Sequence, residues 1–177
     1  MATKKTETKA TKAAPAKAAP AKAAPAKAAP AKAAPTKAAP APAKASAGAG
    51  TAASPWTLKT PPGTSEFQAH RDEAAGALIV QVGSTQLRYQ LRCIEDLHAM
   101  LKKHGDWMLL GSADEQKDAA PGTVEAWGRA ASNPVGGWYG TKKGLRGRFG
   151  MYVPPVMEVL GLAEVEHNPK NNRMRAK

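Results

Sequence analysis

The amino-terminal third of this 177-residue chain has almost no acidic residues and no aromatic ones. Residues 1–54 contain ten lysines but only one acid, Glu7, and every aromatic residue lies from Trp56 onward. A hydrophobic core can therefore first form near residue 55, and a segment of this charge and composition is expected to stay disordered. The sequence predicts a disordered tail over residues 1–54 and one small domain over residues 55–177.

A single cysteine, Cys93, excludes a disulfide within the chain and any zinc site built from a cysteine pair. It ends the inward-facing set of a predicted strand, which indicates an inert core thiol. No apolar run approaches the ~18 residues of a membrane-spanning helix, and the amino terminus has no apolar core typical of a secretory signal. We therefore expect a cytoplasmic protein without membrane contact.

The tail is built from a five-residue repeat, which over residues 12–41 reads KAAPAKAAPAKAAPAKAAPAKAAPTKAAPA. Each proline removes an amide donor and costs roughly 3 kcal/mol inside a helix, so no long helix can form. A period of five matches neither the about 3.6 residues per turn of an α-helix nor the about 3 of polyproline II, so the lysines share no face. This argues against an amphipathic membrane helix and favours a ligand with negative charge on all sides.

Nucleic acid is such a ligand, because its phosphates attract lysine without regard to base sequence. The tail residues predicted to contact phosphates are Lys17, Lys22, Lys27, Lys32 and Lys37. The tail also resembles the lysine-alanine-proline tails of bacterial linker-histone-like and nucleoid proteins, which implies a place in the nucleoid. The alternative is a semi-rigid spacer, because such repeats stay extended whatever they touch.

The first part of the domain predicts antiparallel strands followed by a helix. Alternating apolar residues on both sides of Gly83-Ser84 predict a β-hairpin, and SEFQAHR predicts a strand before it. Residues 94–104 predict a helix with acids in its first turn and Gly105 after its last. DWMLLG predicts a short buried strand or a helix end, and Thr123 has the position of an N-cap. The expected fold class is α+β, with a small antiparallel sheet, hairpins and short helices.

The last part of the domain combines a glycine-rich basic segment with a helix and a hairpin. GGWYGTKKGLRGRFG holds three aromatic residues that we expect in the core. VPPVMEVLGL predicts a short helix beginning at Pro154 or Pro155, and AEVEHNPKNNRMRA predicts a hairpin that turns at residues 168–171. This helix and hairpin are similar to the end of winged-helix domains, in which the hairpin is the wing. The apolar helix itself favours burial over base reading.

From PWTLKTPPGTSEFQ at its start to NNRMRA at its end, the domain resembles an uncharacterised bacterial domain family, which implies no activity. No motif indicates catalysis. The GxxxxGK[ST] spacing of a phosphate-binding loop is absent, and His98 and His104 lie six residues apart, on different faces of a helix. We therefore expect no enzyme activity, no cofactor and no metal.

The candidate site is the basic carboxy-terminal edge, because residues 142–177 hold eight basic and three acidic residues. Uncompensated cations beside glycines, which let the backbone approach a phosphate closely, are typical of nucleic-acid contact. The residues predicted to bind are Lys142, Lys143, Arg146, Arg148, Lys170, Arg173 and Arg175.

The sequence therefore predicts a nucleoid-associated protein that binds DNA largely without sequence preference. One alternative is an RNA-binding module, for which GLRG has the GxxG pattern of the loop in KH domains. A second is a protein-interaction domain for which the tail is only a spacer, and a third is an enzyme whose site has no recognisable motif.

Overall fold

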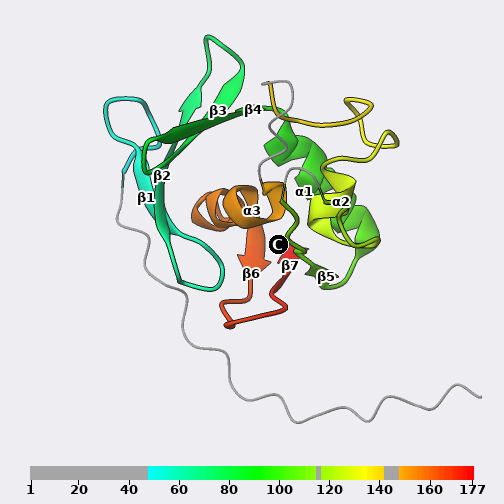
Figure 1. The fold of residues 1–177 in the computed structure, drawn as a ribbon. Coiled ribbons are helices and arrows are strands. Elements are labelled where there is room, and N and C mark those ends of the chain that lie inside the picture. Colours follow the sequence, from blue (N-terminus) through cyan, green and yellow to red (C-terminus); the bar gives the residue numbers. More distant parts are fainter. Residues whose placement is uncertain (1–47, 115–116, 142–147) are drawn as a thin grey trace, which may run out of the picture. The chain divides into compact units, whose positions relative to one another are not determined.

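The computed structural model describes residues 48–114, 117–141 and 148–177, which form an α+β domain (Figure 1). The first sheet is an antiparallel meander of β1 (Trp56–Lys59), β2 (Glu66–Asp72), β3 (Ala77–Val82) and β4 (Thr85–Gln90). The second sheet has the order β5-β7-β6 and contains β5 (Met108–Leu109), β6 (Ala163–Val165) and β7 (Arg173–Ala176). The helices are α1 (Cys93–His104), α2 (Val124–Trp127) and α3 (Phe149–Val159). The expected fold class is confirmed.

The predicted hairpin is confirmed as β3 and β4, which are joined by Gly83-Ser84. Gly83 has a φ of 56°, a conformation that glycine adopts without the steric cost of a side chain. Leu78 pairs with Tyr89 across the hairpin, and both lie on the buried inner face of the sheet. The predicted strand SEFQAHR is β2, and the structure adds β1, which was not predicted, at the edge of the meander.

The helix predicted after the hairpin is α1, which begins at Cys93, one residue earlier than expected. Cys93 thus belongs to the helix and not to a strand, although its side chain is buried as expected. Gly105 ends α1 with a left-handed φ of 75°, and its amide donates to the Leu101 carbonyl at 3.0 Å. The N-cap of α2 is confirmed, because the Thr123 hydroxyl accepts a hydrogen bond from the Ala126 amide at 3.1 Å.

The start of α3 differs from the expectation that Pro154 or Pro155 is its first residue. Helix α3 begins at Phe149 and contains both prolines in its interior. An interior proline leaves a carbonyl one turn earlier without an amide partner in the helix. A tertiary contact fixes the earlier start, because the Gly150 amide in the first turn donates to the buried carboxylate of Glu125 at 2.6 Å.

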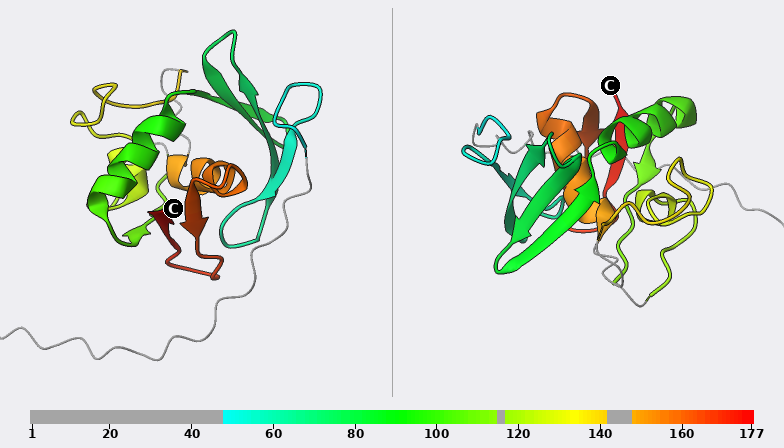
Figure 2. Two further views of the ribbon diagram at one scale, coloured as in Figure 1. Left: turned by 180° about the vertical axis from the view of Figure 1, so that it is seen from behind. Right: turned by 90° about the horizontal axis from the view of Figure 1, so that it is seen from above.

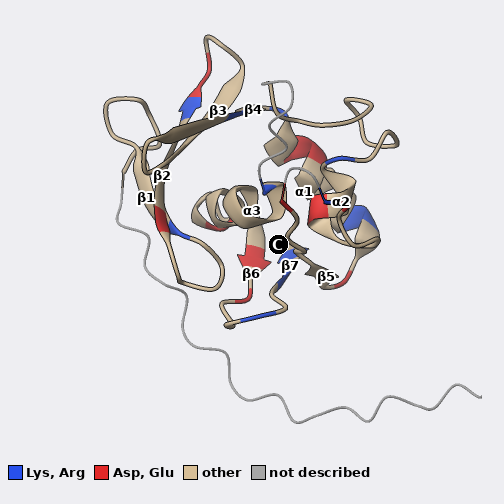
Figure 3. Ribbon diagram, in the orientation of Figure 1, with Lys and Arg blue, Asp and Glu red and all other residues tan. Residues whose placement is uncertain are grey.

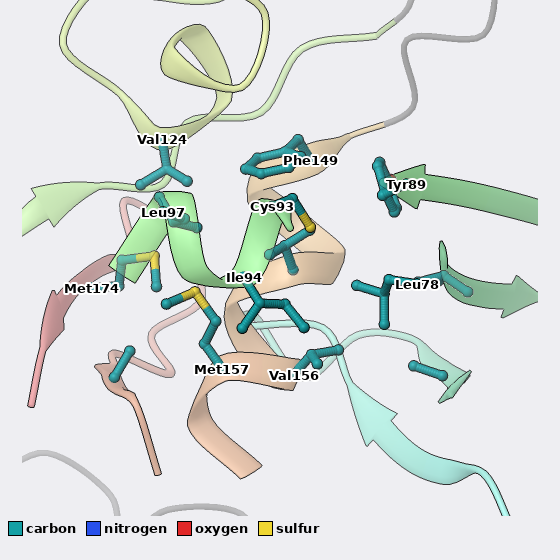
Figure 4. Packing of buried hydrophobic residues seen from close by; sticks show 14 of the residues in the cluster. Leu78, Tyr89, Cys93, Ile94, Leu97, Val124, Phe149, Val156, Met157 and Met174 are labelled. Atoms are coloured by element: carbon teal, nitrogen blue, oxygen red, sulfur yellow. The ribbon is translucent and has the colours of Figure 1, made fainter. Parts of the chain in front are cut away.

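Helix α3 lies in the centre of the described domain. Figures 1 and 2 show it between the four-stranded sheet on one side and α1 with α2 on the other. Every residue of α3 is buried or partly buried, and Met157 belongs to the same core cluster as Ile94 and Leu97 of α1 (Figure 4). The helix is buried, as its apolar sequence indicated. Because a helix that reads DNA needs an exposed face, the winged-helix likeness is not confirmed.

Aromatic rings surround Phe149 at the start of α3. The centroid of the Phe149 ring lies 5.6 Å from that of Tyr139 and 5.8 Å from that of Tyr89, with Trp127 and Trp138 slightly farther away. Tyr139 and Phe149 are fully buried, whereas Trp138 is partly exposed. The expectation that the aromatic residues of the glycine-rich segment lie in the core is therefore confirmed for Tyr139 and Phe149.

A buried ion pair joins α2 to α3. The Glu125 side chain has no exposed surface, and it accepts a hydrogen bond from Arg129 Nε at 2.8 Å in addition to the one from Gly150. The same guanidinium donates to the carbonyls of Ala113 at 2.8 Å and Lys117 at 3.1 Å. Burial raises the pKa of the Glu125 carboxyl, while its two hydrogen-bond donors act in the opposite direction. This polar centre fixes the first turn of α3.

Candidate nucleic-acid interface

Most of the residues predicted to bind nucleic acid lie outside the described residues. They are the tail residues Lys17, Lys22, Lys27, Lys32 and Lys37, and the loop residues Lys142, Lys143 and Arg146. The GxxG pattern at residues 144–147 lies outside them as well. Of the predicted contacts the structure places Arg148 before α3, Lys170 between β6 and β7, and Arg173 and Arg175 on β7.

Arg148 is paired with Asp114. Its Nη2 donates to Asp114 Oδ1 at 2.7 Å, and this hydrogen bond lowers the pKa of the Asp114 carboxyl. Both side chains are more than half exposed, so the ion pair contributes little to stability. The expectation of an uncompensated cation is therefore wrong at this position.

Arg173 and Arg175 point to the same face of the small sheet, because they lie two residues apart on its central strand. Arg173 Nε donates to Glu166 Oε2 at 3.0 Å, and Arg175 Nε donates to Glu164 Oε2 at 2.7 Å. The first of these hydrogen bonds lowers the pKa of Glu166. Figure 3 shows the basic residues of β7 beside the acidic residues in β6 and just after it. Arg173 and Arg175 are thus each paired with a carboxylate, so the expectation of uncompensated cations is wrong here too.

Two apolar side chains that sequence reasoning missed lie on the other side of the arginines. The centroid of the Trp107 ring is 4.8 Å from Arg175 Cζ and 5.5 Å from Arg173 Cζ. Leu109, which pairs with Arg173 across β5 and β7, is 45% exposed. The signal was present in DWMLLG, where alternation places Trp107 and Leu109 on the face opposite to Met108.

One surface results, which we call the β7 face: Trp107, Leu109, Glu164, Glu166, Arg173 and Arg175. Its side chains form three neighbouring columns. Trp107 and Leu109 are apolar, Arg173 and Arg175 are basic, and Glu164 and Glu166 are acidic. At the Arg175 end lies a hollow of about 390 Å³, which Arg175 lines together with the exposed cations Lys102 and Lys177 and with Glu164. An anionic group such as a phosphate fits this end by charge.

Lys170 lies near the other end of the β7 face. It is exposed and lines a second hollow, of about 400 Å³, that also includes Leu109. The loop around it is held by Asn172, whose side chain accepts from the Asn168 amide at 2.6 Å and donates to the Asn168 carbonyl at 2.8 Å. The structure thus places Arg173 and Arg175 on one face and Lys170 at a hollow that includes Leu109 of that face, whereas Arg148 is paired with Asp114.

His167, in the same loop, connects three parts of the domain. Its Nε2 lies 2.9 Å from a carboxylate oxygen of Glu158 on α3, and its Nδ1 lies 3.3 Å from the Pro61 carbonyl between β1 and β2. Both partners are acceptors, so only the doubly protonated ring can donate to both. The hydrogen bond with Glu158 accordingly raises the pKa of His167.

We expect this contact to make stability depend on pH. The pKa of His167 is raised in the folded state, so the contribution of the charged ring is complete below its unfolded pKa of about 6.5 and is lost as pH rises through the folded pKa. Urea unfolding should show that wild type loses free energy of unfolding relative to His167→Gln as the pH rises above about 6.5. Exposed His104 is the matched control, and His104→Gln should keep the wild-type dependence. Parallel curves for wild type and His167→Gln would contradict the prediction.

The described part of the chain gives little support to a metal site, a cysteine nucleophile or a membrane span. No three His, Cys, Asp or Glu side chains in it gather closely enough to hold a metal ion. Burial raises the pKa of the Cys93 thiol, so it is not activated as a nucleophile. No helix in the described residues has the length and apolar character to cross a membrane.

The fold and its surface define a small α+β domain with a face that carries a partly exposed tryptophan together with exposed leucine and arginine side chains. The chain belongs to the family of unknown function DUF6855, whose model matches residues 48–177. This confirms the resemblance to an uncharacterised domain family. No curated protein and no solved structure matches the chain.

Proposed function

We propose that this protein is a nucleoid-associated protein that binds DNA with little sequence preference. The observation that carries the proposal is the distribution of charge. Residues 1–54 hold ten lysines and one acid, whereas residues 55–177 hold 16 basic and 13 acidic residues. A chain segment of this kind neutralises phosphates without reading bases, and its affinity comes from the release of counterions.

The domain supports the same kind of binding. Helix α3, which would read bases in a winged-helix domain, is enclosed, so contact through the β6–β7 hairpin is favoured. This hairpin carries Lys170, Arg173 and Arg175, whose natural ligands are phosphates. Phosphate contacts position a protein on nucleic acid but carry no sequence information. RNA offers the same phosphates, so both nucleic acids belong in the test.

The proposal predicts a large loss of salt dependence when tail lysines are neutralised in the full chain. The variant replaces Lys17, Lys22, Lys27, Lys32 and Lys37 with glutamine. The slope of log affinity against log salt should fall in magnitude by about 4.5 units on duplex DNA, because each of the five phosphate contacts contributes ~0.9. Fluorescence anisotropy with two duplexes of unrelated sequence measures the slope, and the two should bind equally.

The matched control has the same tail residues in scrambled order. It should bind like wild type, because the number of charges and not their register determines the affinity. If the glutamine variant keeps the wild-type slope, the tail is not the DNA contact, and its role is that of a spacer. Repeating the titration with duplex RNA decides between the two nucleic acids.

A specific observation favours a protein-interaction domain as the second candidate. Each described arginine of the candidate site is paired with a carboxylate, so the β7 face has no net charge of its own. Exposed tryptophan and arginine side chains are also typical of protein interfaces. Under this alternative, substitutions on the β7 face leave the affinity for every nucleic acid unchanged.

A further inference from the structure

We propose that the β7 face binds unpaired bases, so that the protein prefers single-stranded to duplex nucleic acid. The inference rests on the proposed function and specifies the ligand of its folded domain. The tail attracts phosphates of either form, whereas the β7 face stacks a base on Trp107 and on the guanidinium planes beside it. Aromatic rings and arginine planes are the surfaces on which proteins stack exposed bases.

The geometry of Trp107 carries the inference. Its ring is partly exposed and lies outside the hydrophobic core cluster, so packing of the core does not account for it. Two guanidinium groups lie within 5.5 Å of its centroid, and each is held by a carboxylate next to it on the sheet. The ion pairs therefore hold planar cations over the aromatic ring before any ligand binds, and ring and guanidinium groups form one stacking platform. Bases inside a duplex are already stacked on one another and cannot reach this surface.

The cations around the β7 face fit an extended strand of nucleic acid. Arg173, Arg175 and Lys177 follow one another at every second position of β7 and its end, about 7 Å apart along the strand. Lys102 and Lys177 line the hollow at one end, and Lys170 lines the hollow that includes Leu109. Phosphates on either side of a stacked base thus have a cation at each end of the face. Leu109 adds an exposed apolar contact for the base itself.

Trp107→Ala in the full chain tests the inference. The probes are a fluorescein-labelled thymine strand of about 20 nucleotides and a duplex of the same length. Affinity for the single strand should fall about ten-fold, while affinity for the duplex should change by less than about two-fold. The salt slope should not change, because stacking releases no counterions. In wild type the single strand should also quench tryptophan fluorescence, and in the variant this quenching should be smaller.

Three variants separate stacking from charge and from folding. Trp107→Phe keeps an aromatic ring and should bind the single strand with intermediate affinity. Lys102→Gln removes an exposed cation that lines the hollow and should weaken both forms and lower the slope by about 1. Lys59→Ala removes an exposed lysine paired with Glu66 on the other sheet, and it should leave both affinities unchanged. Thermal melting confirms that each variant is folded.

An unchanged ratio of single-strand to duplex affinity in Trp107→Ala would overturn the inference. If the tail glutamine variant loses its salt slope at the same time, the proposed function stands and only the stacking role fails. If wild type binds neither form, both proposals fail, and the β7 face is left as a surface for a protein partner.

Discussion

Replacing Glu125 with alanine is expected to lower the free energy of unfolding by about 3–5 kcal/mol. The fully buried carboxylate is the partner of the Arg129 guanidinium and of the Gly150 amide. Without it, a charge and a backbone donor stay buried with a partner missing, and the desolvation cost of both is no longer offset. Glu125→Gln should be destabilising as well, because an amide can replace the acceptor of Gly150 but not the negative charge beside Arg129. Urea unfolding followed by tryptophan fluorescence measures the difference.

The matched control for this prediction is Lys59→Ala. The Lys59–Glu66 pair also joins a basic side chain to a glutamate, but both side chains are more than half exposed, so its loss should cost less than about 1 kcal/mol. Arg129→Ala should be as damaging as Glu125→Ala, because the guanidinium also binds the carbonyls of Ala113 and Lys117. The double variant Glu125→Ala/Arg129→Ala should lose less free energy of unfolding than the sum of the two single variants, because either single substitution already breaks the same ion pair. A Glu125→Ala variant as stable as Lys59→Ala would show that the pair does not hold α2 to α3.

The elements that sequence reasoning predicted are those whose signals are local. Gly83 and Gly105 adopt left-handed conformations at the ends of periodic segments, and these positions predicted the β3–β4 hairpin and the end of α1. The start of α3 has no local signal, because it depends on a hydrogen bond from Gly150 to Glu125, which lies 25 residues earlier. Two prolines five and six residues beyond that start suggested a later beginning. Tertiary contact decided this boundary.

For the candidate site, too, only the features that are local in the sequence were predictable. The number of cations in the carboxy-terminal segment is visible in the sequence, but the carboxylates that pair with them are brought close by strand register and loop packing. Asp114 lies 34 residues from Arg148, and Glu164 lies 11 residues from Arg175. The contact of Trp107 with the arginines arises because β5 joins β7, a pairing between distant parts of the chain that no local pattern indicates. Counting charges therefore overestimated how many cations lack a partner.

The second large effect is expected at Phe149, where Phe149→Ala should lower the free energy of unfolding by about 3–5 kcal/mol. The ring is fully buried, and its nearest ring neighbours are Tyr139 and Tyr89. Alanine would leave a cavity that these rigid aromatic neighbours cannot fill by small shifts, so the cost includes the cavity as well as the lost burial. Urea unfolding is the measurement. If the variant is too unstable for a reliable baseline, Phe149→Leu should show the same effect at a smaller size.

Gly128 provides a sharper form of the same prediction. Its φ of −61° is helical, so alanine there would ordinarily stabilise the chain by up to about 1 kcal/mol. A Cβ at this position would, however, lie 2.6 Å from Phe149 Cδ1, and Gly128→Ala should therefore destabilise wild type by about 1–3 kcal/mol. In the Phe149→Ala background the methyl group would instead enter the cavity, and the same substitution should become neutral or stabilising. A double-mutant cycle measures this change of sign, and equal effects of Gly128→Ala in both backgrounds would show that the two side chains do not compete for one space.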